Sequence, residues 1–430
     1  MTPLILWFRR DLRLDDNPML AAAVETGRPL IPVFIGDDSV TNLGAAARWR
    51  MGEAVASFGQ RLAGIGGALV LRRGDAATVL HELLAETGAG GVWWSRLYDP
   101  QSIERDKALK SSLLADGFEA QSFASHTLAE PWHLETKAGG YFKVYTPFYK
   151  AHVARGVSQP LPAPKRLTIK AVLPRSEPLD SWRLGAAMNR GAPIIARYAQ
   201  IGESAALARL DQFLIGPVED YREARDFPVR NAVSGLSENL TYGEISARRV
   251  WHAAMAVEAA QPGHRGAEHF RKELAWRDFA HHLMFHTPHI LEHSWRPEWA
   301  SFSWLDESEA SKTWRRGMTG EAFVDAGLRE MYVTGTMHNR VRMIVASYLT
   351  KHLLSHWKIG MDWFAECLTD WDPASNAMGW QWTAGCGPDA APYFRVFNPE
   401  TQAEKFDKTG AYRHKFIAEI NASPGPDALA

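Results

Sequence analysis

Residues 370–382 read DWDPASNAMGWQW, and the chain continues at residues 385–399 with GCGPDAAPYFRVFNP. The first part holds two acids two residues apart, and its Asp372-Pro373 step is typical of a helix start, where Asp caps the helix and Pro fits the first turn. An amide, Asn376, follows one turn later, and two indoles then flank a second amide. Each feature alone is explained by a helix cap or by tryptophans packed at a loop. Together they favour a site for a planar, polar, redox-active ring system.

The composition is that of an ordinary globular protein. The chain has 430 residues, of which 46% are hydrophobic and 23% are charged, enough for two or three domains and a large core. The net charge is −1. This balance neither requires nor excludes a nucleic-acid partner, because a basic face can be offset by acids elsewhere.

The cysteines and the start of the chain indicate the compartment. Cys367 and Cys386 are the two cysteines, which implies no disulfide framework and favours a reducing environment. No apolar run approaches the roughly 20 residues that cross a bilayer, and Arg9 and Arg10 come too early for a signal peptide. We therefore expect a cytoplasmic protein.

Short apolar runs alternate with helical patterns in the first part of the chain. The predicted buried strands are residues 4–8, 30–35, 68–71 and 91–94, and the predicted amphipathic helices are about residues 17–27, 44–64, 76–88 and 101–116. Continuous apolar strands separated by helices indicate a parallel sheet covered on both faces. The fold class is therefore α/β followed by all-α.

Three regions are predicted. Residues 1–128 form the Rossmann-like domain. Residues 129–195 contain eight of the prolines and little sustained periodicity, as expected of an interdomain linker laid over the surface. Residues 196–430 form a helical domain, because amphipathic segments follow one another there with no convincing strand.

The turn after the first strand argues against a dinucleotide dehydrogenase. Residues 8–17 read FRRDLRLDDN, where a Rossmann fingerprint would place Gly-x-Gly-x-x-Gly. A solvated loop with a helix cap is the simplest explanation of these charges. The same letters, together with those of residues 370–399, nonetheless resemble two signatures of one family, the photolyases and cryptochromes. The resemblance extends from residue 4 to about residue 412 and is closest to class I photolyases, which act on cyclobutane pyrimidine dimers (CPDs).

That resemblance implies FAD as the cofactor and a set of residues around it. Asp370 and Asp372 would meet the isoalloxazine and ribityl region, with Asn376 against the flavin N5. Val233 to Ser237 would cradle the pyrophosphate, although Ser237 could equally be a helix cap. This chain has Val233 and Gly235 where the family pattern has Thr and Arg. The remaining residues that we assign to the cofactor are Tyr221, Ser234, Leu236, Arg277 and Arg342.

Two helical segments are predicted to form the substrate pocket. Glu273, Trp276 and Arg277 fall on one face of a helix, as do Asn339, Arg342 and Met343 of another. A salt bridge beside a core tryptophan explains the first group equally well. By resemblance, the residues that line the lesion pocket of CPD photolyases are Glu273, Trp276, Asn339, Met343 and Trp382. The (6-4) photolyases would be expected to show a histidine pair in this pocket.

The resemblance also implies electron transfer and binding to DNA. Trp304, Trp357 and Trp380 match the three-indole chain that brings an electron to photo-oxidised flavin, although any one of them could simply be core. The candidate contacts to UV-damaged DNA are Arg225, Arg271, Lys272, Arg315, Arg316, Arg340, Arg395 and Lys405. Some family members hold a folate or deazaflavin antenna between the domains. Residues 98–102, YDPQS, lack the Asn-Glu pair of some folate-binding members.

The sequence therefore predicts a monomeric, light-dependent deoxyribodipyrimidine photolyase, a carbon–carbon lyase. Excited FADH⁻ would donate an electron to a flipped-out dimer, and the electron would return after the ring had split. Glu273 and Asn339 would hold the dimer, and Asn376 would tune the flavin. The alternative is a cryptochrome-like blue-light photoreceptor with the same flavin and no repair activity. A light-insensitive nucleotide-binding protein is disfavoured, because the phosphate loop is missing.

Overall fold

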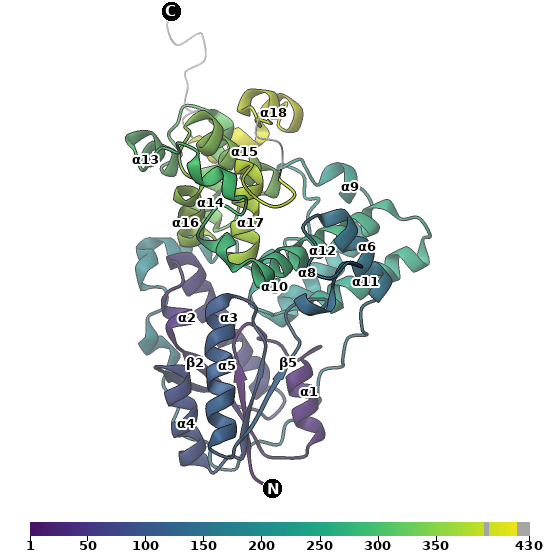
Figure 1. Ribbon diagram of the computed structural model, residues 1–430, viewed down its shortest axis with the longest axis vertical. Helices are drawn as coiled ribbons and strands as arrows, with labels where there is room; N and C mark the ends of the chain where they lie inside the picture. Colours follow the sequence, from purple (N-terminus) through teal and green to yellow (C-terminus); the bar gives the residue numbers. More distant parts are fainter. Residues whose placement is uncertain (391–394, 419–430) are drawn as a thin grey trace, which may run out of the picture.

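A computed structural model describes residues 1–390 and 395–418. These residues form an α/β part and a largely helical part that lie against each other (Figure 1). Residues 391–394, which belong to the second quoted stretch, lie outside the described residues. No helix of the described chain is long and apolar enough to cross a membrane.

The sheet is parallel throughout, with the strand order β3-β2-β1-β4-β5. Its strands are β1 (Leu4–Phe8), β2 (Leu30–Gly36), β3 (Val70–Arg73), β4 (Gly91–Ser95) and β5 (Glu119–Phe123). The four predicted strands are confirmed. β5 was not predicted, because this edge strand reads EAQSF and is only partly buried, so its residues show no apolar run.

Helices cover both faces of the sheet, as expected for crossovers between parallel strands. Leu4, Leu6 and Phe8 pack with α1 and α3, whereas Ile5 and Trp7 of the same strand pack with α4 and α5. The helices are α1 (Pro18–Glu25), α3 (Ala45–Ala63), α4 (Ala76–Thr87) and α5 (Pro100–Ala115). Each lies within one or two residues of its predicted range. The Rossmann-like fold is confirmed.

Helices dominate the chain after β5. The ones that matter for the site are α12 (Arg265–His286), α15 (Asn339–Ser347), α16 (Trp357–Cys367) and α17 (Pro373–Ala384). Around them lie α8 (Glu203–Ile215), α11 (Ala247–Ala260), α14 (Ala322–Thr334), α18 (Pro399–Phe406) and α19 (Ala411–Phe416). Between β5 and residue 418, the described residues contain only isolated bridges and no named strand.

The segment between the two parts is more ordered than a surface connector. It contains α6 (Tyr145–Arg155), whose Phe148 is 1% exposed and packs on Phe279 of α12 with ring centroids 5.1 Å apart. Later in the segment, Ile169 bridges to Leu30 at the sheet. The segment therefore contributes to the core of the helical part and also lies along the α/β part.

Buried ion pairs join the two parts. Arg50 of α3 has no exposed side-chain surface and contacts Glu238 and Glu244 of the helical part, with Nη2 of Arg50 2.6 Å from Oε2 of Glu244. Nearby, Arg248 pairs with Asp16 at 2.7 Å. A buried charge without its partner is costly, so these contacts fix how the two parts dock.

Candidate functional site

A cavity of about 590 Å³ opens among the helices of the second part. Its wall contains polar groups and indoles from α12, α15 and α17. The predicted site residues that line it are Glu273, Trp276, Asn339, Arg342, Met343, Asp370, Asp372, Asn376, Trp380 and Trp382. Residues up to 109 positions apart in the sequence, from Glu273 to Trp382, thus meet at one site.

The start of α17 places two polar groups in the wall. Asp372 caps the helix, with its Oδ1 accepting the backbone N–H of Ser375 at 2.8 Å, and Pro373 occupies the first turn. One turn later, Nδ2 of Asn376 donates to the backbone carbonyl of Met361 at 3.0 Å. This bond fixes the amide plane of Asn376 at the cavity.

Asp370 is held by an arginine from the neighbouring helix. Nη2 of Arg342 lies 2.9 and 2.8 Å from the two carboxylate oxygens of Asp370, and Nε of Arg342 donates to the carbonyl of Met337 at 2.8 Å. Charge-assisted bonds of this kind are stronger than neutral ones. They hold both side chains in place on the cavity wall.

Asp372 lies in a buried cluster with three basic side chains. Burial alone would raise the pKa of Asp372, but His281, Arg277 and His126 outweigh it and hold that pKa well below the ordinary value. Nε2 of His281 lies 3.4 Å from Oδ2 of Asp372. Asp372 is therefore ionised at neutral pH.

The same cluster could be mistaken for a metal site. His126, His281 and Asp372 bring potential ligand atoms within 4.8 Å of one another. However, Arg277 donates to Nε2 of His126 at 2.7 Å and to its backbone carbonyl at 2.7 Å. A guanidinium in this position occupies one ligand atom and repels a cation, so the cluster does not fit a metal ion.

On α12, Glu273 and Trp276 face the cavity. Arg225 and Glu273 form an ion pair, and Nε2 of His269 lies 3.5 Å from Oε1 of Glu273. The ring of Trp276 stacks on Tyr145 of α6, with centroids 3.7 Å apart and planes 7° from parallel. Stacking fixes the indole plane.

Arg277 was predicted on the same face as Glu273 but does not line this cavity. It reaches the segment after β5, where it bonds His126, and burial lowers its pKa. The ion pair of Glu273 is consequently made with Arg225, at the end of α9 and three helices earlier in the chain, and not within α12.

The start of α15 supplies the opposite wall. His338 caps this helix, with its Nδ1 accepting the backbone N–H of Arg340 at 3.2 Å. Asn339 is the first helical residue and Met343 follows one turn later, so both reach the cavity. Trp382, near the end of α17, packs on Phe397, with ring centroids 6.2 Å apart.

The segment predicted to cradle phosphate lies apart from this wall. Ser234 and Leu236 precede α10 (Ser237–Thr241), and the backbone N–H of Leu236 donates to Oγ of Ser234 at 3.4 Å. Tyr221 is buried against Phe270, with ring centroids 5.5 Å apart. Among the described residues that line the cavity, none comes from Ser234, Leu236, Ser237 or Tyr221.

The three predicted electron-transfer tryptophans have different surroundings. Trp380 lines the cavity and packs on α16, where a Cβ on Gly360 would lie 2.0 Å from the Trp380 ring. Trp357 is fully buried and Trp304 is partly exposed. His356 lies between these two, with ring centroids 5.2 Å from Trp357 and 5.9 Å from Trp304.

The predicted DNA-contacting cations are mostly neutralised by acids. The ion pairs are Arg225 with Glu273, Arg271 with Glu258, Lys272 with Glu268, Arg315 with Glu307 and Arg340 with Asp226. Arg316, Arg395 and Lys405 are exposed. Arg225 and Arg340 line the cavity, so they surround its opening and do not form a separate basic face.

Sequence reasoning missed Tyr145, His269 and the two histidines beside Asp372. Tyr145 and His126 lie before the helical region, more than 120 residues from the helix they contact. A helical spacing in the sequence shows neighbours along one helix only. Such a spacing gives no signal for Tyr145 and His126, whereas His269, four residues before Glu273 on the same helix, could have been found by it.

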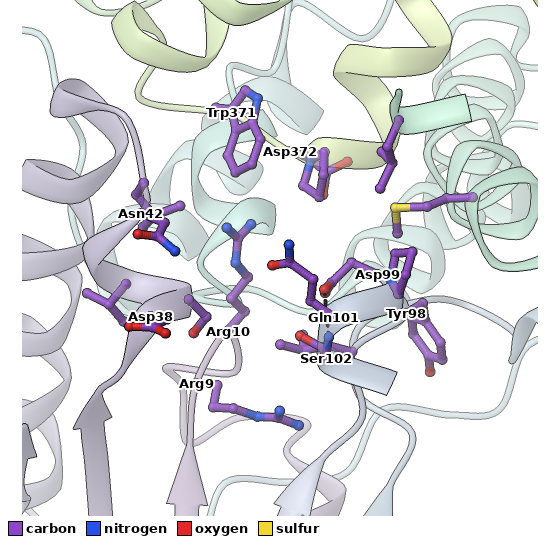
Figure 2. Close-up of a pocket in the computed structure, with 18 of the residues that line it drawn as sticks. Arg9, Arg10, Asp38, Asn42, Tyr98, Asp99, Gln101, Ser102, Trp371 and Asp372 are labelled. Atoms are coloured by element: carbon purple, nitrogen blue, oxygen red, sulfur yellow. Dashed lines mark hydrogen bonds between the residues drawn. The ribbon is translucent and has the colours of Figure 1, made fainter. Parts of the chain in front are cut away.

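A second cavity, of about 410 Å³, lies between the two parts of the molecule. Figure 2 shows Arg10 pointing from the carboxyl end of β1 towards Trp371, with Asp38 and Asn42 on one side and Tyr98 and Ser102 on the other. The guanidinium carbon of Arg10 lies 5.9 Å from the centroid of the Trp371 ring. The residues that line both cavities are Trp371, Asp372 and Asn376.

Comparison with protein families gives two matches along this chain. Residues 4–165 match the DNA photolyase family model, and residues 270–429 match the model of the FAD binding domain of DNA photolyase. The second match covers α15, α17 and all but the first five residues of α12, the helices that build the larger cavity.

Individual relatives match over nearly the whole chain. A deoxyribodipyrimidine photo-lyase of Agrobacterium fabrum is 47% identical over 97% of this chain and 87% of its own length. Cryptochrome-1 of Arabidopsis thaliana is 32% identical over 98% of this chain and 63% of its own. The crystal structure of a class III photolyase from Agrobacterium tumefaciens superposes with a TM-score of 0.95 at 45% identity, covering 100% of this chain and 91% of that one. The chain therefore belongs to the DNA photolyase and cryptochrome family and carries that family's FAD-binding domain.

Proposed function

We propose that the protein is a CPD photolyase that splits pyrimidine dimers in DNA with blue light. One observation carries the proposal: Glu273, Trp276, Asn339, Met343 and Trp382 line the same cavity as Asp370, Asp372 and Asn376. A lesion and a flavin could therefore lie in contact. Beyond this reaction, we do not assign the chain to class I or to class III of the photolyases. Class I is the prediction from the sequence, whereas class III is the class named for the Agrobacterium tumefaciens structure.

The chain's own groups fit a flavin. A flat ring system requires hydrogen-bonding groups at its edge and apolar surface at its faces. Asp370 with Arg342 and Asn376 offer the former, and Trp380 offers the latter. The indole N–H of Trp380 is buried without a hydrogen-bond partner among the described residues, so a ligand acceptor could complete it. Bound reduced FAD supplies the excited electron that opens the dimer.

The substrate residues divide the remaining work. Glu273, paired with Arg225, accepts hydrogen bonds from the edge of a pyrimidine, and Asn339 can both donate and accept. Trp276, fixed on one face by Tyr145, and Trp382 pack on the bases, while Met343 adapts its shape to them. The helical cavity thereby replaces the stacking that a flipped dimer loses.

Other assignments from the resemblance remain part of the proposal. We propose that Tyr221, Ser234, Leu236, Ser237 and Arg277 contact more distant parts of FAD. Trp304, Trp357 and Trp380 carry the electron that re-reduces it. The exposed Arg316, Arg395 and Lys405, together with the paired cations, contact DNA phosphates. The functional regions are residues 1–128, 129–195 and 196–430.

The interdomain cavity suits a second, antenna chromophore. Arg10 offers a cation next to the flat surface of Trp371, as an anionic aromatic ligand would require. Tyr98, Asp99, Gln101 and Ser102, which lack the folate-type Asn-Glu pair, form the opposite wall. We therefore propose an aromatic antenna here and do not assign it to the folate or the deazaflavin class.

The test is repair of an oligonucleotide that contains one CPD, by chemically reduced protein, in blue light and in the dark. Light-dependent loss of the dimer is expected, while an oligonucleotide with a (6-4) photoproduct should stay unrepaired, because His269 is the one histidine among the described lining residues. Glu273→Ala should reduce the repair yield at least tenfold and keep the flavin. Flavin that photoreduces without repair would support the cryptochrome-like alternative.

A further inference from the structure

Two buried histidines of the interdomain cavity lie beside Asp372, which borders the cavity proposed for flavin as well. His126 and His281 both line the interdomain cavity, and their rings meet edge to face with centroids 4.8 Å apart. Their residues are 7% and 3% exposed. Asp372, which contacts His281, lines both cavities. The histidines thus lie on the interdomain side of Asp372, which borders both spaces.

His281 is unusual for a buried side chain. Neither of its ring nitrogens has a hydrogen-bond partner among the described residues, since the 3.4 Å contact with Asp372 has an ion-pair distance without hydrogen-bond alignment. Leaving a buried polar group unpaired costs free energy. Such groups in native structures call for a functional explanation, and a ring with both nitrogens free can accept a proton at one and release it at the other.

His126 cannot accept and release a proton in this way. Its Nε2 accepts a hydrogen bond from Arg277 at 2.7 Å, so the lone pair needed for a second proton is already used. Burial, followed by the charges of Arg277 and His281, holds the pKa of His126 well below its usual value. His126 therefore stays neutral and supports the ring of His281 without carrying protons.

We propose that His281 carries protons from the interdomain cavity to Asp372 and so to the flavin when the flavin is reduced. The inference rests on the proposed function. For each proton transferred, water in the interdomain cavity protonates one nitrogen of His281, and the other nitrogen releases its proton on the Asp372 side. The two electrons that accompany each proton come through the tryptophans and are replaced by an external one-electron reductant that releases no proton, such as ferrocyanide. His281 ends neutral and Asp372 ends ionised.

The charges around His281 permit this transfer. Ionised Asp372, at the cap of α17, attracts the imidazolium that forms during the transfer, whereas the guanidinium of Arg277 in the same cluster repels it. Tyr98 lies edge to face with His281, with ring centroids 6.4 Å apart. The interdomain cavity reaches solvent through the exposed Asp38 and Glu292 of its lining.

The experiment compares flavin-loaded wild-type protein with His281→Gln and with the control His286→Gln. His286 lies on the same helix, bonds the carbonyl of Pro131 and lines neither cavity. Flavin is reduced by light with ferrocyanide present, which releases no proton when it is oxidised, and proton uptake is followed with a pH-indicator dye in H₂O and D₂O. We expect at least tenfold slower uptake in His281→Gln, a larger solvent isotope effect, and wild-type behaviour in His286→Gln.

A third variant separates proton transfer from structural support. In His281→Gly, imidazole added to the buffer should enter from the interdomain cavity and restore most of the uptake rate. The inference is overturned if His281→Gln takes up protons at the wild-type rate, or if its slower uptake comes with lost flavin and no rescue by imidazole. Wild-type protein that binds no flavin would instead overturn the proposed function itself.

Discussion

The two cavities are built in different ways. The larger one is lined by Asp372, which caps α17, and by Asn339, the residue after the cap of α15. The interdomain cavity lies at the carboxyl ends of β1, β2 and β4, the usual ligand edge of a parallel sheet, and needs the helical part to close it. The first is therefore as rigid as one helical bundle, and the second depends on how two parts dock.

The two cavities depend on different contacts. Arg50, whose pKa is raised because its carboxylate partners outweigh burial, holds Glu238 and Glu244 across the junction. No residue of that triad lines the larger cavity. Damage at the junction should therefore affect the interdomain cavity first and the helical cavity later.

Breaking the junction is expected to have the largest effect. Arg50→Met leaves two buried carboxylates without a cation, which should lower the free energy of unfolding by about 3–5 kcal/mol. Urea denaturation measures this loss. The control Lys107→Met removes an exposed pair with Glu104 and should change stability by less than about 1 kcal/mol. If Arg50→Met unfolds at the wild-type urea concentration, the two parts are not held together by this ion pair.

Removing an indole from the helical cavity comes next. Trp382→Ala should weaken binding to CPD-containing DNA by about 1–3 kcal/mol, a roughly 5- to 150-fold loss, because one base loses its stacking surface. Affinity is measured by fluorescence anisotropy at fixed salt. Trp132, which is 38% exposed and lines neither cavity, supplies the control Trp132→Ala. Equal affinity of the two variants would contradict the role of Trp382.

The helical cavity was largely predictable because its residues follow local rules. The cap at Asp372 and the one-turn spacing of Asn339 and Met343 are visible in the sequence. Long apolar strands and amphipathic helices likewise marked the sheet. The elements that were not predicted from the sequence lack a local pattern. They are the polar edge strand β5 and the helix α6, whose apolar face is short and lies among prolines.

Contacts between residues far apart in the sequence could not be predicted, because they too leave no local pattern. Glu273 was expected beside Arg277 on one helix, but the fold pairs Glu273 with Arg225 and turns Arg277 towards His126. Positions i and i+4 are neighbours without facing the same partner, because they differ by about 40° around the helix. The family resemblance named the pocket residues, and only the structure shows which side chains hold them.

Tyr145 gives the smallest expected effect and the sharpest contrast, because it joins the helical cavity from a segment outside the bundle's main helices. Tyr145→Leu should cost about 0.5–1.5 kcal/mol of stacking on Trp276, which corresponds to a 2- to 13-fold loss of affinity for CPD-containing DNA. Tyr145→Phe keeps the ring and loses only the hydroxyl bond to the carbonyl of Lys272, so its affinity should stay near wild type. The same anisotropy titration compares the two. Equal losses of affinity in both variants would mean that the hydroxyl, and not the stacked ring, fixes the wall of the cavity. In that case α6 would support the cavity through its bond to Lys272 and not through the stacking on Trp276.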